Sequence, residues 1–179
     1  HGGCVLQSSF VPGLPFSAKD LQQPAQKHAI ALEAARRLQP GEKIYLDSGT
    51  TTVHLARLLP GDKNLQIFTN NLRVAMELFG RTGIEVIVFG GALGSNNPSL
   101  VGEMAMARIH DFRFDVAVLG ADAIDAGRAE FYCGDLRAAM LCQAAQRQAE
   151  RAIVLADSTK FGKHSLIVAG HLDAGTVLI

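Results

Sequence analysis

A run of hydroxyl residues around a glycine is the part of the sequence best suited to bind an anion. The run consists of Asp47, Ser48, Gly49, Thr50, Thr51 and Thr52. A helix that begins here would add free N–H groups and a positive dipole end to the hydroxyl donors, which suits a phosphate monoester. Gly49 would let the backbone approach that ligand without a Cβ in the way. Ordinary capping by Ser48 or Thr50 is the alternative, but a cap needs only one hydroxyl.

Four further groups of residues are candidates for the same site. They are Thr69 with Asn70, Gly90 with Gly91, Gly120 with Asp122, and Lys160. An asparagine can donate to and accept from a sugar hydroxyl, although capping a helix explains Asn70 equally well. Asp122 could bind sugar hydroxyls or act as a base, whereas a turn cap before Gly127 is the better explanation of Asp125. Lys160 would pair with a phosphate, or it is an exposed loop lysine; for the glycine pair, turn geometry is the favoured explanation.

Short apolar runs and helical patterns alternate along the chain and predict the elements that position these residues. Strands are predicted at residues 44–46, 66–69, 86–89, 116–119 and 153–156, with two more at 166–169 and 176–179. Apolar residues at i, i+3, i+4 and i+7 predict helices near residues 31–38, 55–59, 72–79 and 136–143. Runs that are apolar at consecutive positions are typical of strands covered on both faces. The expected fold is therefore α/β, an open and mostly parallel Rossmann-like sheet with helices on both faces.

In open α/β sheets, ligands bind beyond the carboxyl ends of the strands. Five of the predicted strands end at the polar or glycine groups described above, so we expect those groups to converge. Segments 1–23 and 90–99 are rich in glycine, proline and serine and are predicted to be loops.

Composition excludes several classes of protein. The 179 residues are 48% hydrophobic and 19% charged, which is typical of one globular domain. The formal net charge is +0, so this chain is not basic enough to hold DNA by itself. The three cysteines form no CxxC pair, which favours the reducing cytoplasm. We find no apolar run of the roughly 20 residues that span a bilayer, and no signal peptide, so no membrane association is expected.

Metal and nucleotide sites are not expected either. The six histidines have no metal-binding spacing and no cysteine cluster beside them, so no metal is predicted. Neither a GK[ST] loop nor a GxGxxG turn follows the first predicted strand, which disfavours a nucleotide-cofactor protein. We therefore expect no cofactor. Because the sequence starts at His1, we expect it to be a fragment or a processed chain.

Taken in order, these motifs resemble the sensor domain of the DeoR family of transcriptional repressors. The resemblance covers nearly the whole chain, through residues 44–51, 69–70, 90–91, 101–102, 120–125 and 157–162. Residues 1–4 are similar to the end of the family's winged helix-turn-helix module. The resemblance thus implies that residues 1–23 are a linker from an absent DNA-binding module and that residues 24–179 are the effector-binding sensor domain.

The same resemblance implies a fold like that of ribose-5-phosphate isomerase and CoA transferases. By that likeness Gly49, Thr50 and Thr51 would hold an effector's phosphate. The rest of the pocket would be lined by Asp47, Asn70, Asp122 and Lys160. The implied function is repression of sugar or polyol catabolism, relieved by a phosphorylated sugar, with DNA contacted only through the absent module. Palindromic operators mirror protein symmetry, so a dimer or tetramer is expected.

A sugar-phosphate isomerase is the alternative from another class. The isomerase motif Asp-Gly-Ala-Asp is represented here by Leu119, Gly120, Ala121 and Asp122, so one of its paired carboxylates is missing. The glutamate base expected downstream has no clear match, and Asp135 and Arg137 are the candidates left in that stretch. Proton transfer needs a base within hydrogen-bond reach, so the depleted set favours binding without turnover and no enzymatic activity.

Overall fold

A six-stranded parallel sheet forms the centre of the molecule in a computed structural model, which describes residues 10–179. The strand order is β11-β9-β6-β1-β2-β3, and every neighbouring pair is parallel. These strands are β1 (Lys43–Leu46), β2 (Leu65–Thr69), β3 (Ile84–Val88), β6 (Phe114–Gly120), β9 (Ala149–Leu155) and β11 (Thr176–Leu178). The motif at residues 1–4 and Cys4 lie outside the described residues.

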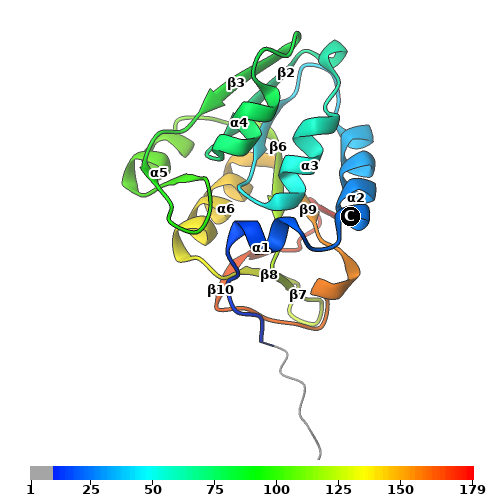
Figure 1. The fold of residues 1–179 in the computed structure, drawn as a ribbon, viewed down its shortest axis with the longest axis vertical. Coiled ribbons are helices and arrows are strands. Elements are labelled where there is room, and N and C mark those ends of the chain that lie inside the picture. The colour runs from blue at the N-terminus through cyan, green and yellow to red at the C-terminus, as the bar shows by residue number, and fades with distance from the viewer. Residues whose placement is uncertain (1–9) are drawn as a thin grey trace, which may run out of the picture.

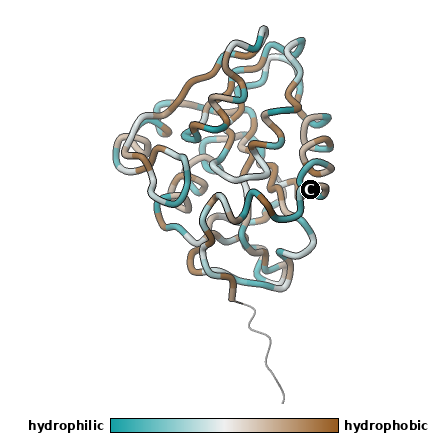
Figure 2. Tube along the Cα trace, viewed as in Figure 1, coloured by the Kyte–Doolittle hydropathy of each residue, from teal (hydrophilic) through white to brown (hydrophobic). Residues whose placement is uncertain are grey.

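Helices cover both faces of this sheet (Figure 1). The helices are α2 (Pro24–Arg37), α3 (Thr50–Leu58) and α4 (Leu72–Leu78) on one face, and α5 (Glu103–Ile109) and α6 (Leu136–Gln148) on the other. Successive strand residues point to opposite faces, so Ile44 and Leu46 join one buried cluster while Tyr45 joins the other. Figure 2 shows hydrophobic and hydrophilic residues alternating along the helices, as expected where one helix face packs on a sheet. The predicted α/β fold is confirmed.

Smaller elements lie beside the main sheet. A three-stranded antiparallel sheet has the order β10-β8-β7, and two short strands form the hairpin β4-β5. Their bounds are β4 (Ala92–Leu93), β5 (Leu100–Val101), β7 (Ala123–Asp125), β8 (Glu130–Cys133) and β10 (Ile167–His171). The strand predicted at 166–169 therefore exists as β10, but it pairs outside the main sheet. Two single turns of 3-10 helix are η1 (Gly61–Lys63) and η2 (Ser158–Lys160).

The first described residues include a helix that was not predicted. Residues 1–23 were expected to be a loop, but α1 (Phe16–Asp20) forms within them. The side chain of Phe16 is buried in the cluster beneath α2 and α3, which explains why so short a helix is stable. Figure 1 shows α1 in front of the sheet, between α3 and β8. None of the helices between residues 10 and 179 combines the length and apolar character needed to cross a membrane.

Candidate functional site

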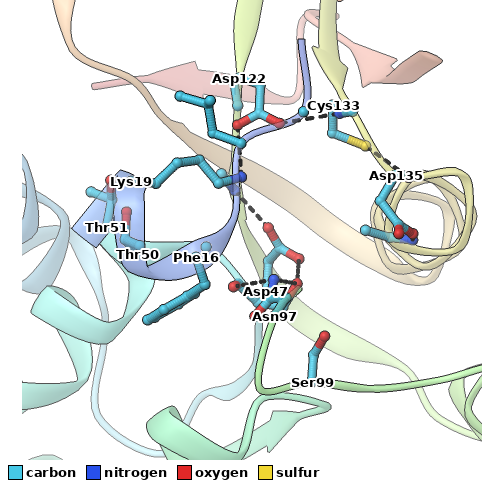
Figure 3. A pocket seen from close by; sticks show the side chains of 18 of the residues that line it. Phe16, Lys19, Asp47, Thr50, Thr51, Asn97, Ser99, Asp122, Cys133 and Asp135 are labelled. Carbon is cyan, nitrogen blue, oxygen red and sulfur yellow. Dashed lines mark hydrogen bonds and ion pairs between the residues drawn. The ribbon is translucent and has the colours of Figure 1, made fainter. Parts of the chain in front are cut away.

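A cavity of about 320 Å³ opens where three central strands end. Its lining includes residues 47–51 after β1, 120–122 after β6, and 156, 157, 159 and 160 after β9. Additional lining residues come from α1, α2, the β4–β5 loop and the start of α6. Figure 3 shows side chains from these separate segments directed toward one space. Of the five groups expected to converge, those after β1, β6 and β9 therefore line one cavity, and those after β2 and β3 do not.

The N-terminus of α3 forms one wall of the cavity. Gly49 is the N-cap residue, and no side chain caps the helix. Thr50 and Thr51 occupy its first turn and line the cavity, where backbone N–H groups lack partners within the helix. The capping alternative considered for Ser48 and Thr50 thus does not apply. An uncapped helix start with adjacent hydroxyl groups is suited to receive an anion.

Three lysines line the same cavity, and two of them were not predicted. Lys160 lines the cavity as expected, together with Lys19 of α1 and Lys27 of α2. Only 5% of Lys27 is exposed, and its Nζ donates to the backbone carbonyl of Lys19. Burial lowers the pKa of Lys27, and the charges of Lys160 and Lys19 lower it further, while Asp20 and Asp157 oppose this shift. The ammonium group of Lys27 can therefore donate hydrogen bonds to an anion bound in this cavity.

The sequence does contain a signal for Lys27. It lies four residues before Ala31 and seven before Ala34, on the stripe of α2 that is buried against the sheet. A lysine is seldom found on the apolar stripe of a helix unless it has a partner or a function. The sequence feature that points to Lys27 is therefore a charged residue at a position where the helical spacing of α2 predicts an apolar one.

Two carboxylates line the cavity on the side of β1 and β6. Asp47 is buried and accepts a hydrogen bond from the Gly120 N–H at 3.1 Å. Burial raises the pKa of Asp47, while backbone hydrogen bonds from Ser48 and Gly120 act in the opposite direction. Asp122 accepts from the Gly134 N–H at 3.1 Å and pairs with Lys19 at 3.0 Å. Both carboxylates can accept hydrogen bonds from hydroxyl groups of a ligand.

The β4–β5 loop supplies an amide that sequence analysis did not identify. Asn97 Nδ2 donates to the carbonyl and the hydroxyl oxygen of Ser48, at 3.1 and 3.3 Å. Asn97 Oδ1 is buried and has no hydrogen-bond partner among the described residues. Since Asn97 lines the cavity, this oxygen can accept a hydrogen bond from a ligand hydroxyl.

Three of the predicted polar side chains lie outside the cavity lining because the protein's own backbone binds them. Thr52 Oγ1 donates to the carbonyls of Asp47 and Gly49, at 2.7 and 2.6 Å. Thr69 Oγ1 donates to the Leu46 carbonyl at 2.7 Å. The amide of Asn70 donates to the Leu100 carbonyl at 3.0 Å and accepts from the Tyr45 hydroxyl at 3.1 Å. These groups position the strand ends and do not line the site.

Gly90 and Gly91 also lie outside the lining. Gly91 has a φ of 154°, and a Cβ there would lie 2.6 Å from the Val101 carbonyl oxygen. The backbone segments at Gly91 and Val101 approach each other closely beside the β4–β5 hairpin, and this approach requires a glycine at position 91. The structure assigns no turn at either glycine, so Gly91 is explained by this close approach.

The start of α6 contributes Asp135 and Arg137 to the lining. Asp135 Oδ1 accepts from the backbone N–H groups of Arg137 and Ala138, at 2.9 and 3.0 Å, and so caps α6. Its other oxygen lies 3.8 Å from the Arg137 guanidinium. The Asp135 carboxylate, which is the candidate for an isomerase base, is thus engaged in a helix cap and an ion pair. Asp125 caps a turn, as expected, by accepting from the Arg128 N–H at 3.1 Å.

The fold is an α/β domain similar to that of ribose-5-phosphate isomerases. Ribose-5-phosphate isomerase A from Methanocaldococcus jannaschii matches with a TM-score of 0.58 and 18% identity, over 79% of this chain and 56% of that one. The eIF2B delta subunit from Chaetomium thermophilum matches with a TM-score of 0.57 and 17% identity, over 85% of this chain and 58% of that one. At these identities the likeness shows the fold alone.

The chain belongs to the DeoR family, since the family model described as the DeoR C terminal sensor domain matches residues 22–179. It is 34% identical to a putative aga operon transcriptional repressor of Escherichia coli O157:H7, over 93% of this chain and 62% of that protein. It is 31% identical to the glycerol-3-phosphate regulon repressor of Escherichia coli K12, over 96% of this chain and 68% of that protein. The chain thus spans about two thirds of the length of these relatives. The resemblance to DeoR-family sensor domains is confirmed.

Proposed function

We propose that this chain is the effector-sensing domain of a transcriptional repressor and that its cavity binds a phosphorylated sugar or polyol without catalysing a reaction. Its curated relatives are named transcriptional repressors, and one is named for a glycerol-3-phosphate regulon. In this proposal residues 1–23 lead from a DNA-binding module to the sensor domain at 24–179. The whole protein acts in the cytoplasm as a homo-oligomer, a dimer or a tetramer.

The observation that carries the proposal is the uncapped start of α3 on a cavity that also receives a buried lysine. The phosphate binds at Gly49, Thr50 and Thr51, with Lys27 and Lys160 supplying the positive charge. A dianion needs such charge-assisted donors to replace its water shell. The cavity lining also offers acceptors to the sugar hydroxyls, namely Asp47, Asp122 and Asn97 Oδ1.

The effector acts by shifting an equilibrium between two arrangements of the domain. A ligand can move such an equilibrium only by its difference in affinity for the two states. We propose that the occupied cavity orders the loops at residues 90–98 and 157–163. Helices at an oligomer interface then shift and reorient the DNA-binding modules.

A thermal-shift screen of phosphorylated sugars, each beside its free sugar, tests this proposal. A ligand at about 100 times its dissociation constant adds about 2.7 kcal/mol to the free energy of unfolding. We expect the phosphorylated form alone to give this shift, and Thr51→Ala or Lys160→Ala to weaken it. Lys43→Ala is the matched control, because Lys43 is exposed at the opposite end of β1. Equal responses to phosphorylated and free sugar would remove the basis for an anion site.

The fold likeness to ribose-5-phosphate isomerase keeps one alternative worth testing. An isomerase needs a free base beside the substrate, and Asp135 is engaged as the cap of α6. We therefore expect no interconversion when the protein is incubated with pentose or hexose phosphates. Turnover on the order of 1 s⁻¹, within the usual range of enzymes, would establish the isomerase alternative instead.

A further inference from the structure

We propose that residues 10–23 form a strap over the cavity and that Lys19 of this strap binds the anionic group of the effector. The occupied cavity then holds the strap more firmly than the empty one does. This inference rests on the proposed anion site and adds the means by which its occupancy is transmitted. The strap is the segment that leads toward the N-terminal end of the chain.

The strap is anchored to loops that are themselves next to the cavity. The Val11 N–H donates to the His164 carbonyl at 2.8 Å, and Ser165 Oγ donates to the Val11 carbonyl at 2.7 Å. The Phe16 N–H donates to the carbonyl of Asn96, a residue of the β4–β5 loop that lines the cavity, at 2.8 Å. These are mostly single backbone contacts. A displacement of the cavity-lining β4–β5 loop would therefore act on the strap through the hydrogen bond between Phe16 and Asn96.

One glycine contact shows how closely the strap lies on the cavity wall. A Cβ placed on Gly134 would lie 2.4 Å from the Cα of Gly13, so the two backbones touch. Gly134 also donates its N–H to Asp122. The strap thus packs against the same residue that positions one of the proposed ligand acceptors.

Lys19 links the strap to Asp122, a residue of the cavity lining that follows β6. Figure 3 shows its side chain extending from α1 toward Asp122, and Nζ lies 3.0 Å from Asp122 Oδ1. An ammonium group has three donors, so Lys19 can bind an anion while it keeps this ion pair. Its side chain is 24% exposed and that of Asp122 is 12% exposed, so solvent only partly screens the pair. The backbone of Lys19 accepts a hydrogen bond from the buried Lys27, which ties α1 to α2.

An anion in the cavity would strengthen these ties. Lys19, Lys27 and Lys160 line one cavity but belong to the strap, to α2 and to η2. Their like charges repel one another in the empty protein, and a phosphate between them gives all three a common partner. An anion bound by all three would therefore tie the strap to α2 and η2.

Hydrogen–deuterium exchange of the chain, with saturating inorganic phosphate against chloride at equal ionic strength, tests the inference. We expect phosphate to slow exchange in the first turn of α3 and, by about tenfold or more, at the strap amides of Val11 and Phe16. In Lys19→Met, phosphate should still slow exchange in the first turn of α3, although by less than in wild type. Phosphate should no longer slow exchange at the strap amides. In the control Lys43→Met both responses should remain.

A second variant separates the ion pair from the anion contact. In Asp122→Asn the strap should exchange faster without phosphate, and phosphate should still slow it, because Lys19 retains its donors. Protection of α3 by phosphate without any response of the strap would overturn the inference and leave the proposed function standing. Absence of protection at both places would overturn the anion site and the strap together.

Discussion

Replacing Lys27 with methionine removes one buried charge while keeping a side chain of similar length. Only 5% of Lys27 is exposed, and its ammonium group donates a hydrogen bond to the Lys19 carbonyl. Loss of that charge-assisted bond costs about 1.5–3 kcal/mol. Burial already disfavours the charged form and lowers the pKa of Lys27, so removing the ammonium group offsets part of this cost. We expect the free energy of unfolding of the empty protein to fall by about 1–2 kcal/mol.

Binding of a phosphorylated effector should respond far more strongly. A hydrogen bond to a charged group contributes about 1.5–3 kcal/mol, which corresponds to about 10- to 150-fold in the dissociation constant. Isothermal titration calorimetry measures this ratio directly. Thermal shifts check it, because an effector at about 100 times its wild-type dissociation constant adds about 2.7 kcal/mol to wild type. The same concentration adds about 0.9 kcal/mol to a variant that binds about 30-fold more weakly.

Lys43→Met is the matched control for Lys27→Met. It makes the same change of charge at an exposed position, at the end of β1 that lies away from Asp47. If Lys27 contacts the phosphate, the control retains wild-type affinity. Unchanged affinity in Lys27→Met, or an equal loss in both variants, would refute the assignment of Lys27 to the anion site.

Two further predictions concern groups around the anion site. Burial raises the pKa of Asp47 above its ordinary value of 3.8. Protonated Asp47 therefore contributes stability to the folded protein below pH 3.8, and this contribution is lost as the pH rises through the raised pKa. Asp47→Asn should therefore be more stable than wild type at pH 7 by about 0.5–2 kcal/mol, with weaker effector binding. Urea unfolding at several pH values checks this, and a gain that grows toward acid pH would contradict it. Thr52→Val should cost about 1–3 kcal/mol in the same assay because two backbone acceptors lose their hydroxyl donor, while effector affinity stays near wild type. A large loss of affinity in that variant would mean that Thr52 contacts the ligand.

The main sheet was predictable because each of its strands contains a run of consecutive apolar residues. This pattern is local, so residues 44–46 and 116–119 can be identified without knowing what packs on them. The strands that were missed are β4, β5, β7 and β8, which are two to four residues long. Strands of this length have no periodicity, and their pairing is decided by distant segments.

Candidate residues lie on the cavity where the strand end itself decides their position. Asp47, Thr50 and Asp122 line the cavity because β1 and β6 place them there. Asn70 does not, because its partners Tyr45 and Leu100 lie 25 and 30 residues away in the sequence and bind its amide first. Local sequence cannot show which of several polar side chains the fold will use for its own hydrogen bonds.

The parts of the site that come from the strap were missed for a different reason. Proline and glycine around α1 predict a loop, and the helix forms because Phe16 finds a place in the core of the domain. Lys19 reaches Asp122 across 103 positions of the sequence. Such a contact depends on the complete tertiary structure.

A crystal structure with the phosphorylated sugar that gives the largest thermal shift would test the central claim most directly. We predict a phosphate group at the first turn of α3, within hydrogen-bond distance of the Thr50 or Thr51 N–H and of the ammonium groups of Lys27 and Lys160. The sugar hydroxyls should then lie toward Asp47 and Asp122. A phosphate directed into solvent, with the start of α3 in contact with a sugar hydroxyl or with nothing, would contradict the account.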